Sequence, residues 1–501
     1  MLPNAKGREN AAPALCDRLH VLPESAWISS GYAVFLPRSK DMQIGSKMVR
    51  LFAACNYCSR NHHATKAKKF PWKMALGSTA VLIIFLFCYS SQLFVWPNVW
   101  LAKKADSRIA TLTPVSGSKM FLLNAYLEHR TWNASIRFIT IAWRSEKIDY
   151  SCVFTCNEGL VPSPAKLTVH PSHFWFPYGT ADLLCEIPPG CSKLRAAVTT
   201  VGGSTSNLTF LPVRNQKRRE SNFPVDFTIC HSTMFNKYNN VLQFVQAMEM
   251  YQLLGAKRVV LYKTDCSPDM EEVLRYYRDI GLIEIIDWPI DKYIKVSSSW
   301  IASESPGDLH YYGQIPVLND CVYRNMYRTK YLFMHDPDEI ILPLQNVTWY
   351  EFLSTLEQKY SSDASFYFEN NVFPIEELEE SGKYNLSQWA GIPGVNFLRH
   401  VMREPIPKRH FTTGKLIVNP RRLFEISVHT IKKQSHRTVE VPYDFARLFH
   451  MRRRKNTKLK REDLVMDKAL WRYAPEMIRG VDHALSKMDL PSRRLNSAVH
   501  P

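Results

Sequence analysis

The stretch Tyr331–Pro343, YLFMHDPDEIILP, says most about the fold of this chain. Its first four residues are apolar or aromatic, which is typical of a buried strand. Asp336, Asp338 and Glu339 then follow within a few positions. Because Pro337 has no N–H for a strand ladder, the strand should end before it and the acids should lie on a loop at the carboxyl edge of a sheet. Ligands of open α/β sheets bind at that edge.

Clustered carboxylates repel one another unless a cation lies among them, and oxygen ligands suit hard divalent ions such as Mg²⁺ or Mn²⁺. Such a site could hold a nucleotide diphosphate through the metal. The alternative is a helix N-terminus or a solvated turn, since acids favour both. A D-x-D pattern is too short to decide between them by itself.

The charge of the chain does not indicate nucleic-acid binding. At 501 residues and 46% hydrophobic content the chain is long enough for about two or three globular domains. Much of the formal charge of +18 comes from residues 1–73, with twelve bases and four acids, and from Arg452–Arg461, with seven bases and no acid. Neither segment interleaves aromatic and basic residues, so we expect a solvated tail or a contact with an acidic membrane face, and no nucleic-acid partner.

The run Met74–Trp96 predicts one transmembrane helix. Its 23 uncharged residues would span about 35 Å as a helix, against a hydrocarbon core of about 30 Å. Four lysines in the preceding eight residues, against Lys103 and Lys104 after the run, favour a cytosolic N-terminus. We therefore expect a disordered cytosolic tail over residues 1–73, a luminal stem over 97–118 and a luminal remainder, as in a type II protein of the Golgi membrane.

The cysteines fit an oxidising compartment. The expected luminal part has a local group of four and three more distant ones: Cys152, Cys156, Cys185 and Cys191, then Cys230, Cys266 and Cys321. Disulfides are the default there, and no histidines accompany the group as a zinc site would require. An odd number leaves at least one cysteine free or paired with a second copy, as in a homodimer. Four N-glycosylation sequons also fall in this part, at Asn133, Asn207, Asn346 and Asn385.

The sequence pattern changes along the expected luminal part. Alternation in Ser135–Ile141 and β-rich runs at 166–169 and 194–201 predict a small β-sandwich-like domain over residues 119–213. Strand and helix patterns then alternate, which predicts a parallel α/β sheet over residues 222–454 and a basic, helical extension over 455–501. The expected elements are strands at 225–229, 258–262, 282–286 and 331–334, and helices at 241–253, 270–280 and 313–327.

The order of these elements resembles glycosyltransferase family 92. The matching segments begin with VDFTICHSTMFNKYNNVLQFVQAMEMYQLLGAKRVVLYKTD, followed by GLIEIIDW, GQIPVLNDCVYRN, YLFMHDPDEIILP and LFHMRRR. The resemblance spans about residues 120–454. It implies a GT-A fold, Mn²⁺ or Mg²⁺ as the metal, and β-1,4 transfer from UDP-galactose to galactose or fucose on the N-glycans of a glycoprotein acceptor.

The resemblance also implies roles for particular residues. Asp336 and Asp338 match the metal-binding acids, with Asp336 also facing the donor, and Glu339 is the acid that follows them. His450 matches a histidine that contacts the metal or a phosphate, and His429 is the competing candidate. The chain departs from the family at Met451, where a tyrosine is usual, and at FLRHV (397–401), where an acid should precede the arginine.

Two further residues are candidates for the donor. Asp265 ends the second strand of the α/β region, where such folds hold uracil or ribose, and its alternative role is to cap the next helix. Arg324, on the helix before the acid-tipped strand, could reach a phosphate; its alternative is an ordinary polar helix face.

For inverting transfer, a carboxylate must take the proton of the attacking hydroxyl. Glu369, in FYFEN, is the candidate base, with Glu376 and Glu377 behind it, and Glu339 is a further candidate. A retaining transferase of the same fold is an alternative. A noncatalytic carbohydrate-binding membrane receptor built on the β domain is another, although it leaves the acids of the α/β region without a use.

Overall fold

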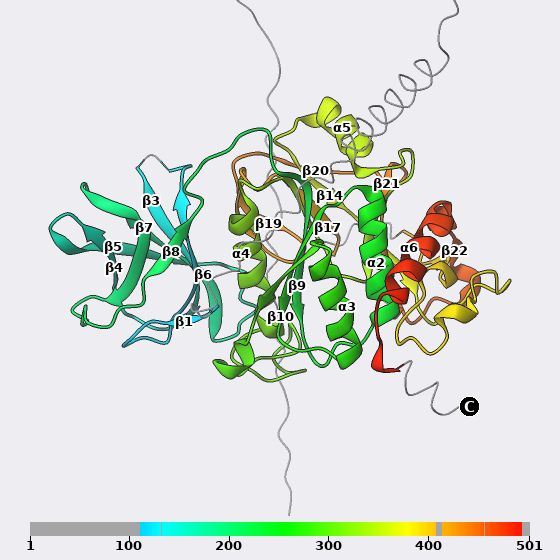
Figure 1. Cartoon of the computed structure of the whole chain (residues 1–501), viewed down its shortest axis with the longest axis horizontal. Coiled ribbons are helices and arrows are strands. Elements are labelled where there is room, and N and C mark those ends of the chain that lie inside the picture. Colours follow the sequence, from blue (N-terminus) through cyan, green and yellow to red (C-terminus); the bar gives the residue numbers. More distant parts are fainter. Residues whose placement is uncertain (1–110, 132, 407–412, 455, 493–501) are drawn as a thin grey trace, which may run out of the picture. The chain divides into compact units, whose positions relative to one another are not determined.

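The computed structural model describes residues 111–131, 133–406, 413–454 and 456–492. The predicted cytosolic tail, the transmembrane span at 74–96 and most of the stem lie outside these ranges. Within them, no helix is both long and apolar enough to cross a membrane. Figure 1 shows an N-terminal all-β part and a mixed α/β part that carries all the labelled helices.

The β domain is one eight-stranded sheet that closes on itself. Its order is β1-β2-β3-β6-β5-β4-β7-β8. The strands are β1 (Thr113–Pro114), β2 (Phe121–Glu128), β3 (Ser135–Trp143), β4 (Tyr150–Cys156), β5 (Gly159–Val169), β6 (Tyr178–Glu186), β7 (Cys191–Thr200) and β8 (Leu211–Arg214). Strand β8 pairs with β7 on one side and with β2 on the other. The domain expected to be β-sandwich-like is thus one continuous sheet, in which β8 joins the two sides and leaves fewer open edges.

Disulfides fasten both domains, as the cysteine count predicted. Cys152–Cys185 and Cys156–Cys191 connect β4 to β6 and β7. Cys230–Cys321 joins the first strand of the α/β domain to a helix of that domain. Among the described residues Cys266 is the free cysteine.

The α/β domain is built on a seven-stranded sheet of order β11-β10-β9-β12-β17-β14-β20. Its strands are β9 (Val225–Met234), β10 (Arg258–Lys263), β11 (Ile283–Asp287), β12 (Thr329–Met334), β14 (Ser365–Phe368), β17 (Lys415–Val418) and β20 (Thr438–Glu440). The four strands β11, β10, β9 and β12 are parallel, as predicted. Strand β17 then runs antiparallel to β12 and to β14, so the whole sheet is mixed.

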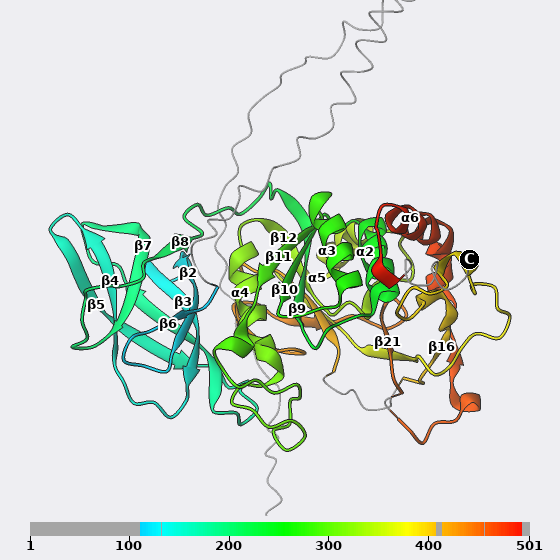
Figure 2. The ribbon, with the colours of Figure 1, turned by 60° about the horizontal axis from the view of Figure 1, so that its bottom comes forward.

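Helices cover both faces of this sheet. They are α2 (Val241–Leu254), α3 (Pro268–Asp279), α4 (Gln314–Asn325), α5 (Trp349–Tyr360) and α6 (Ala474–Ser486). Helix α2 ends at Gly255 with φ of 110°, a backbone conformation that glycine adopts without strain. Residues of α2, α3, α5 and α6 share one apolar core with one face of the sheet, whereas α4 packs on the other face together with residues of the β domain. Figures 1 and 2 show α4 between the β domain and strands β9 and β10.

The α/β domain extends beyond its expected end at residue 454. Helix α6 buries Met477, Val481 and Leu485 in the core that also contains α2. Its amphipathic pattern therefore belongs to the domain and not to a separate extension. Smaller sheets complete the domain: β13 (Glu339–Pro343) with β21 (Ala446–Arg452) and β15 (Asn370–Pro374), β16 (Met402–Arg403) with β22 (Val465–Met466), and β18 (Leu423–Ile426) with β19 (Ile431–Gln434).

A buried acid on α4 connects the two domains. Asp320 accepts hydrogen bonds from Asn124 Nδ2 (2.7 Å) and the Tyr126 hydroxyl (2.5 Å) of the β domain. It also accepts from the Tyr262 hydroxyl on β10 (2.5 Å) and from the Arg324 guanidinium (3.0 Å). Every partner is itself held by the fold, so this junction is rigid.

Candidate active site

The acid loop lies where the order of strands in the sheet reverses. From β9 the chain adds β10 and then β11 on one side, and it returns through α4 to place β12 on the other side of β9. The carboxyl ends of β9 and β12 therefore form the topological switch point, where open α/β sheets bind their ligands. His231 and Ser232 occupy the end of β9, and His335–Asp338 follow β12, which ends at Met334 as Pro337 predicted.

Buried side chains hold this loop in one conformation. The Tyr251 hydroxyl on α2 donates to the carbonyl oxygens of Glu339 (3.0 Å) and Asp336 (3.3 Å). His231 Nδ1 donates to the carbonyl oxygen of His335 (2.7 Å). The backbone N–H of Asp336 also donates to Glu339 Oε2 (2.9 Å). The acids are thus presented by a fixed turn, which is the preorganisation that a binding site requires.

Three side chains form a group that could hold a metal. Asp338, Glu339 and His450 each offer a ligand atom, and these atoms lie within 4.8 Å of one another. The register of β13 against β21 sets Glu339 directly opposite His450. His450 Nε2 lies 3.3 Å from Asp338 Oδ2, and its Nδ1 lies 3.3 Å from Glu339 Oε1. His450 is thus among the candidate ligands, and His429 lies outside this group.

Asp336 stands apart from the group because its carboxylate already has partners. Ser232 Oγ donates to Asp336 Oδ1 (3.0 Å), and Lys415 Nζ donates to Oδ2 (2.7 Å). The same lysine lies 3.0 Å from Glu339 Oε2. The side chains of Asp336 and Asp338 are each 32% exposed, whereas that of Glu339 is 1% exposed. The carboxylates of Asp336 and Asp338 are therefore accessible to solvent, while that of Glu339 is buried behind them.

The charges at the site shift the ionisation of its members. Burial would raise the pKa of Asp336, but Lys415 outweighs it and holds the pKa well below its usual range. Burial raises the pKa of Glu339, with Asp336 and Asp338 adding to the effect against Lys415 and His450. Burial would lower the pKa of His450, but Glu339 and Asp338 outweigh it and raise the pKa. Three carboxylates face one lysine and one histidine, and this excess of negative charge favours an additional cation.

The donor set suits a hard divalent ion. Carboxylate oxygens together with one imidazole nitrogen are ligands that Mn²⁺ accepts, and Mg²⁺ accepts the oxygens. One-third exposure of the Asp338 carboxylate leaves room for a ligand on the solvent side. The residues present therefore fit the metal that the sequence predicted, with Glu339 in the position expected for Asp336.

Arg324 is not part of this site, which corrects the expectation that it contacts a phosphate. Its guanidinium donates to Asp320 (3.0 and 3.1 Å) and lies 3.9 Å from Glu284. Because α4 runs antiparallel to the strand that follows it, the last turn of the helix lies at the opposite edge of the sheet from the acid loop. The side chain is 6% exposed and holds the domain junction.

The other predicted residues lie around the acid loop. His429 Nδ1 donates to the carbonyl oxygen of Gly414 (2.8 Å), the neighbour of Lys415. Asp265 is exposed at the end of β10 and accepts the backbone N–H of Lys237 (3.0 Å). Glu369, between β14 and β15, is buried, and its Oε2 accepts from the Tyr367 hydroxyl (3.1 Å).

The residues that the sequence did not reveal are the ones that support the acids. Lys415, Ser232 and Tyr251 come from β17, β9 and α2, far from the acid loop along the chain. The available signals in the sequence were a lysine at the start of the apolar run KLIV and the polar residues at the end of β9.

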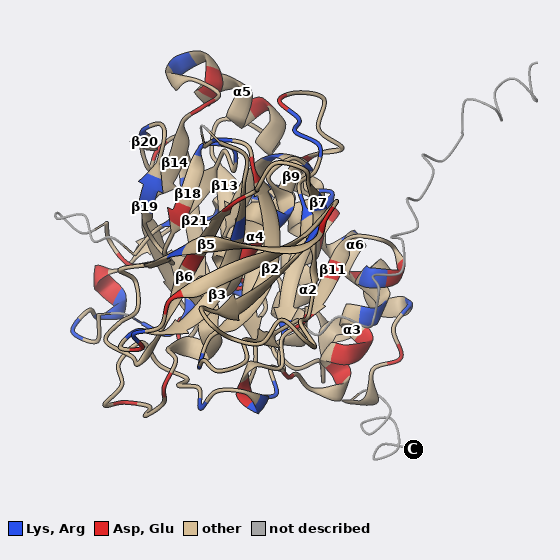
Figure 3. Cartoon of the chain, turned by 90° about the vertical axis from the view of Figure 1, so that its left-hand side faces the viewer, with Lys and Arg blue, Asp and Glu red and all other residues tan. Residues whose placement is uncertain are grey.

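The charges of the described residues are mixed. In the part of the chain drawn in Figure 3, basic and acidic segments are interspersed over the face on view.

The fold and the site together define an α/β domain with a ligand-binding edge and a group of side chains able to hold a divalent metal. Comparison with known proteins identifies the family: the sequence model of glycosyltransferase family 92 matches residues 225–488, so the chain belongs to that family. A relative, Beta-1,4-galactosyltransferase galt-1 of Caenorhabditis elegans, is 22% identical over 348 residues, which cover 67% of this chain and 74% of that protein. The protein is therefore a glycosyltransferase.

Proposed function

We propose that this glycosyltransferase moves galactose from UDP-galactose to a galactose or fucose hydroxyl of an N-glycan, with inversion and a β-1,4 linkage. The main observation in support is the group of Asp338, Glu339 and His450 at the switch point of the sheet. The name of the Caenorhabditis elegans relative, a β-1,4-galactosyltransferase, supports the sugar and the linkage. The order of the parallel strands, with the acids after β12, supports assignment of the domain to the GT-A type.

Asp338, Glu339 and His450 would hold Mn²⁺ or Mg²⁺. A divalent ion held there supplies positive charge next to the diphosphate that leaves the sugar. The chain adds its own contribution at the N-terminus of α4. Among the described residues no side chain caps that end and no acid lies in its first turn, so the positive end of the helix dipole favours an anion there. Gln314 in this first turn also donates to Ser232, the partner of Asp336.

The nucleoside has a matching surface beside the acids. The rings of Phe235 and Tyr312 stack at 4.1 Å with an interplanar angle of 15°. Asp265 lies near these rings, since it accepts the backbone N–H of Lys237 (3.0 Å), whose neighbour Asn236 accepts a hydrogen bond from the Tyr312 hydroxyl (3.0 Å). An aromatic pair and an exposed carboxylate suit a uracil ring and the hydroxyls of a ribose. We therefore keep Asp265 as the proposed nucleoside contact.

Glu369 is the proposed base. Asn370, the next residue in the chain, places its Oδ1 3.1 Å from His450 Nδ1. Glu369 is therefore next in sequence to a residue that contacts the proposed metal-ligating group. The acceptor hydroxyl would give its proton to Glu369 while its oxygen attacks the anomeric carbon, and the bond to the UDP oxygen breaks on the opposite side. Glu339 is a poorer base because its carboxylate already lies against Lys415 and His450.

The decisive experiment incubates the purified full-length protein with UDP-galactose, Mn²⁺ and a panel of galactose-ended and fucose-ended N-glycans. We expect UDP release that depends on both the glycan and the metal, and a β-1,4-linked product by NMR. An α-linked product would instead identify a retaining transferase. Glycan binding without UDP release would identify a carbohydrate-binding receptor and overturn the proposal.

We also propose that residues 97–501 lie in the lumen of the Golgi, with the predicted span at 74–96 in the membrane. The disulfides Cys152–Cys185, Cys156–Cys191 and Cys230–Cys321 support an oxidising compartment. The sequons at Asn133, Asn207 and Asn385 are on exposed residues, where an oligosaccharide could be attached. Loss of mass on treatment with an endoglycosidase tests this, and an unchanged mass would contradict it.

A further inference from the structure

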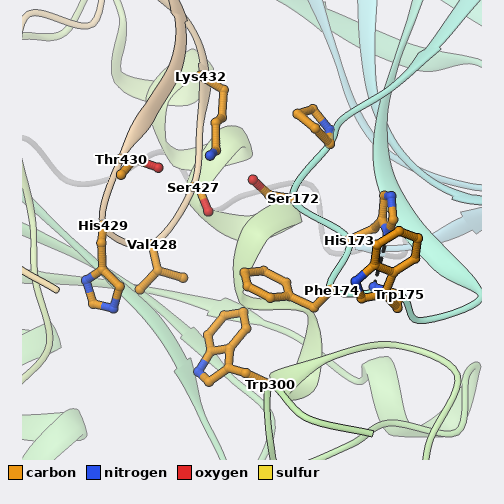
Figure 4. Close-up of a pocket in the computed structure, with 11 residues that line it drawn as sticks. Ser172, His173, Phe174, Trp175, Trp300, Ser427, Val428, His429, Thr430 and Lys432 are labelled. Atoms are coloured by element: carbon orange, nitrogen blue, oxygen red, sulfur yellow. Dashed lines mark hydrogen bonds between the residues drawn. The ribbon is translucent and has the colours of Figure 1, made fainter. Parts of the chain in front are cut away.

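A pocket that the steps above do not use lies between the β domain and the α/β domain. Its volume is about 690 Å³, within the range of small-molecule sites. It is formed by the loop that precedes β6, by Trp300, and by the turn between β18 and β19. Figure 4 shows the lining side chains around one space. They are Pro171, Ser172, His173, Phe174, Trp175, Trp300, Ser427, Val428, His429, Thr430 and Lys432.

One wall of the pocket is aromatic. The Phe174 ring lies 4.7 Å from that of Trp300, and Trp300 stacks on Tyr311 at 4.8 Å with an interplanar angle of 10°. Phe174 and Trp175 have φ of 51° and 66°, a region that side chains other than glycine rarely adopt. They are nevertheless 36% and 86% exposed. A strained loop that turns large rings outward is a feature of binding sites.

Hydrogen bonds hold the loop before β6 in this conformation. His173 Nδ1 accepts the backbone N–H of Trp175 (3.1 Å), as the dashed line in Figure 4 marks. Arg144 Nε donates to the carbonyl oxygen of Phe176 (2.7 Å). The exposed rings are therefore held by the β domain, so they offer a preformed surface with little ordering left for a ligand to bring about.

The opposite wall is polar. In Figure 4 the hydroxyls of Ser172 and Ser427 and the amine of Lys432 point toward the same space, above the Phe174 ring. An aromatic wall facing hydroxyls and an ammonium group suits a ligand with a flat apolar face and hydroxyl edges. A hexose ring has this character, since its C–H groups can lie on an aromatic face while its hydroxyls form hydrogen bonds.

The pocket adjoins the proposed active site from two directions. His429 lines it and contacts Gly414, which precedes Lys415, the partner of Asp336. On the other side Trp300 stacks on Tyr311, whose carbonyl oxygen accepts the N–H of Gln314, and Gln314 connects through Ser232 to Asp336. The acids are thus close to both edges of the pocket.

Two consecutive tyrosines separate this pocket from the nucleoside surface. Tyr311 stacks on Trp300 of the pocket, while Tyr312 stacks on Phe235 at the end of β9. Both have positive φ, 36° and 48°, so the backbone turns sharply between the two stacks. A ligand in the pocket would therefore be separated from the nucleoside surface by this pair of tyrosines.

We propose that this pocket binds the galactose-ended branch of the acceptor glycan, with Phe174 and Trp300 as its stacking surface. The proposal rests on the proposed function and deepens it. Because Phe174 belongs to the β domain, that domain selects the acceptor, while the α/β domain binds the nucleotide sugar.

The test compares steady-state kinetics of the full-length protein and its Phe174→Ala variant with UDP-galactose and a galactose-ended N-glycan. We expect the KM for the glycan to rise about tenfold, which corresponds to about 1.4 kcal/mol, and the KM for UDP-galactose to change less than about twofold. Phe174→Tyr keeps the ring and should restore the KM for the glycan. Tyr350→Ala removes an exposed aromatic on α5, 67% exposed, and is the control that should change neither KM.

Lys432→Met changes an exposed side chain on the polar wall and does not threaten folding. It should raise the KM for the glycan about threefold, the effect of losing one weak, solvent-exposed hydrogen bond. Unchanged KM values for the glycan in both variants overturn the pocket assignment and leave the proposed function standing.

If the wild type transfers no galactose, the proposed function fails, and saturation-transfer NMR of the same glycan with the full-length protein decides the pocket separately. Glycan signals that disappear in Phe174→Ala support the pocket, and wild-type protein that gives no glycan signal overturns it.

Discussion

The N-terminal and C-terminal halves of helix α4 lie beside two groups of acidic side chains and their partners, Asp320 in one and the acid loop in the other, which differ in how completely their charges are satisfied. Toward its C-terminal end, Asp320 has four hydrogen-bond partners from both domains, one of them the Arg324 guanidinium. At its N-terminal end, Gln314 leads through Ser232 to Asp336 and the acid loop. There three carboxylates share Lys415 and His450.

Asp320, which we assign to stability, differs from the acids that we propose to hold a metal in its surroundings and not in residue type. Burial alone would raise the pKa of Asp320, but Arg324 and the Tyr126 and Tyr262 hydroxyls outweigh it and hold the pKa below its usual value. The pKa of Glu339 is instead raised, by burial and by its acidic neighbours. A cluster whose charges are already matched stabilises the fold, whereas a cluster with excess negative charge is ready to take a cation.

The largest effect on stability should come from the matched cluster, which is Asp320 with Arg324 and its other hydrogen-bond partners. Asp320→Asn should lower the free energy of unfolding by about 3–5 kcal/mol, because it leaves the Arg324 guanidinium buried without its counter-charge. The measurement is urea unfolding of the full-length protein. Asp279→Asn changes an exposed acid on α3, with a side chain 57% exposed, and as the control should stay within about 0.5 kcal/mol of the wild type. An Asp320→Asn variant as stable as the wild type would show that this junction does not depend on its charges.

The acid loop is the unmatched cluster, in which negative charges exceed positive ones, and it should give the opposite result: a loss of activity without a loss of stability. Asp338→Asn should reduce kcat about 100-fold to 1000-fold, comparable to the loss of one group that stabilises transition-state charge, and should leave folding intact because its carboxylate is one-third exposed. Galactosyl transfer and the yield of folded protein are measured side by side with those of Asp320→Asn. Retained turnover would remove the metal role of Asp338, and a lost yield of folded protein would assign it a structural one.

The parts of this comparison that the sequence predicted are those governed by local pattern. The apolar period in Val241–Leu254 and the glycine after it located α2 to within one residue, and Pro337 located the end of β12. His450 was found only through the family resemblance. These signals involve neighbours along the chain, so they can be recognised without knowing the fold.

The parts that the sequence did not predict depend on pairing between distant segments. Lys415 reaches Asp336 because β17 lies antiparallel to β12, and nothing near either residue encodes that neighbourhood. The closing of the β domain by β8 is equally non-local. Arg324 was misplaced for a related reason, because the position of a helix residue along the sheet depends on the direction in which the helix runs.

A smaller effect should appear when metal is added to the unmatched cluster. Mn²⁺ at ten times its dissociation constant should stabilise the folded protein by about 1.4 kcal/mol, since it binds the folded state alone. Thermal unfolding without any sugar nucleotide measures this, and a chelator should reverse it. Asp338→Asn should lose the response, whereas Asp320→Asn should keep it from a lower starting temperature. An equal response in wild type and Asp338→Asn would place the metal elsewhere.

The smallest effect concerns the pH dependence of the matched cluster. Because the pKa of Asp320 is lowered by folding, its stabilising contribution is fully present above the unfolded pKa, about 3.9, and is lost as pH falls toward the folded pKa. In that range the unfolded state binds the proton more readily, so the advantage of the wild type over Asp320→Asn should shrink by at most about 1.4 kcal/mol per pH unit. Urea unfolding of both proteins from pH 7 to pH 3 should show a constant gap above about pH 5 and a narrowing one below about pH 4. A gap that stays constant to pH 3 would mean that Asp320 does not gain its stability from its charge, and the contrast between the two clusters would then rest on hydrogen bonding alone.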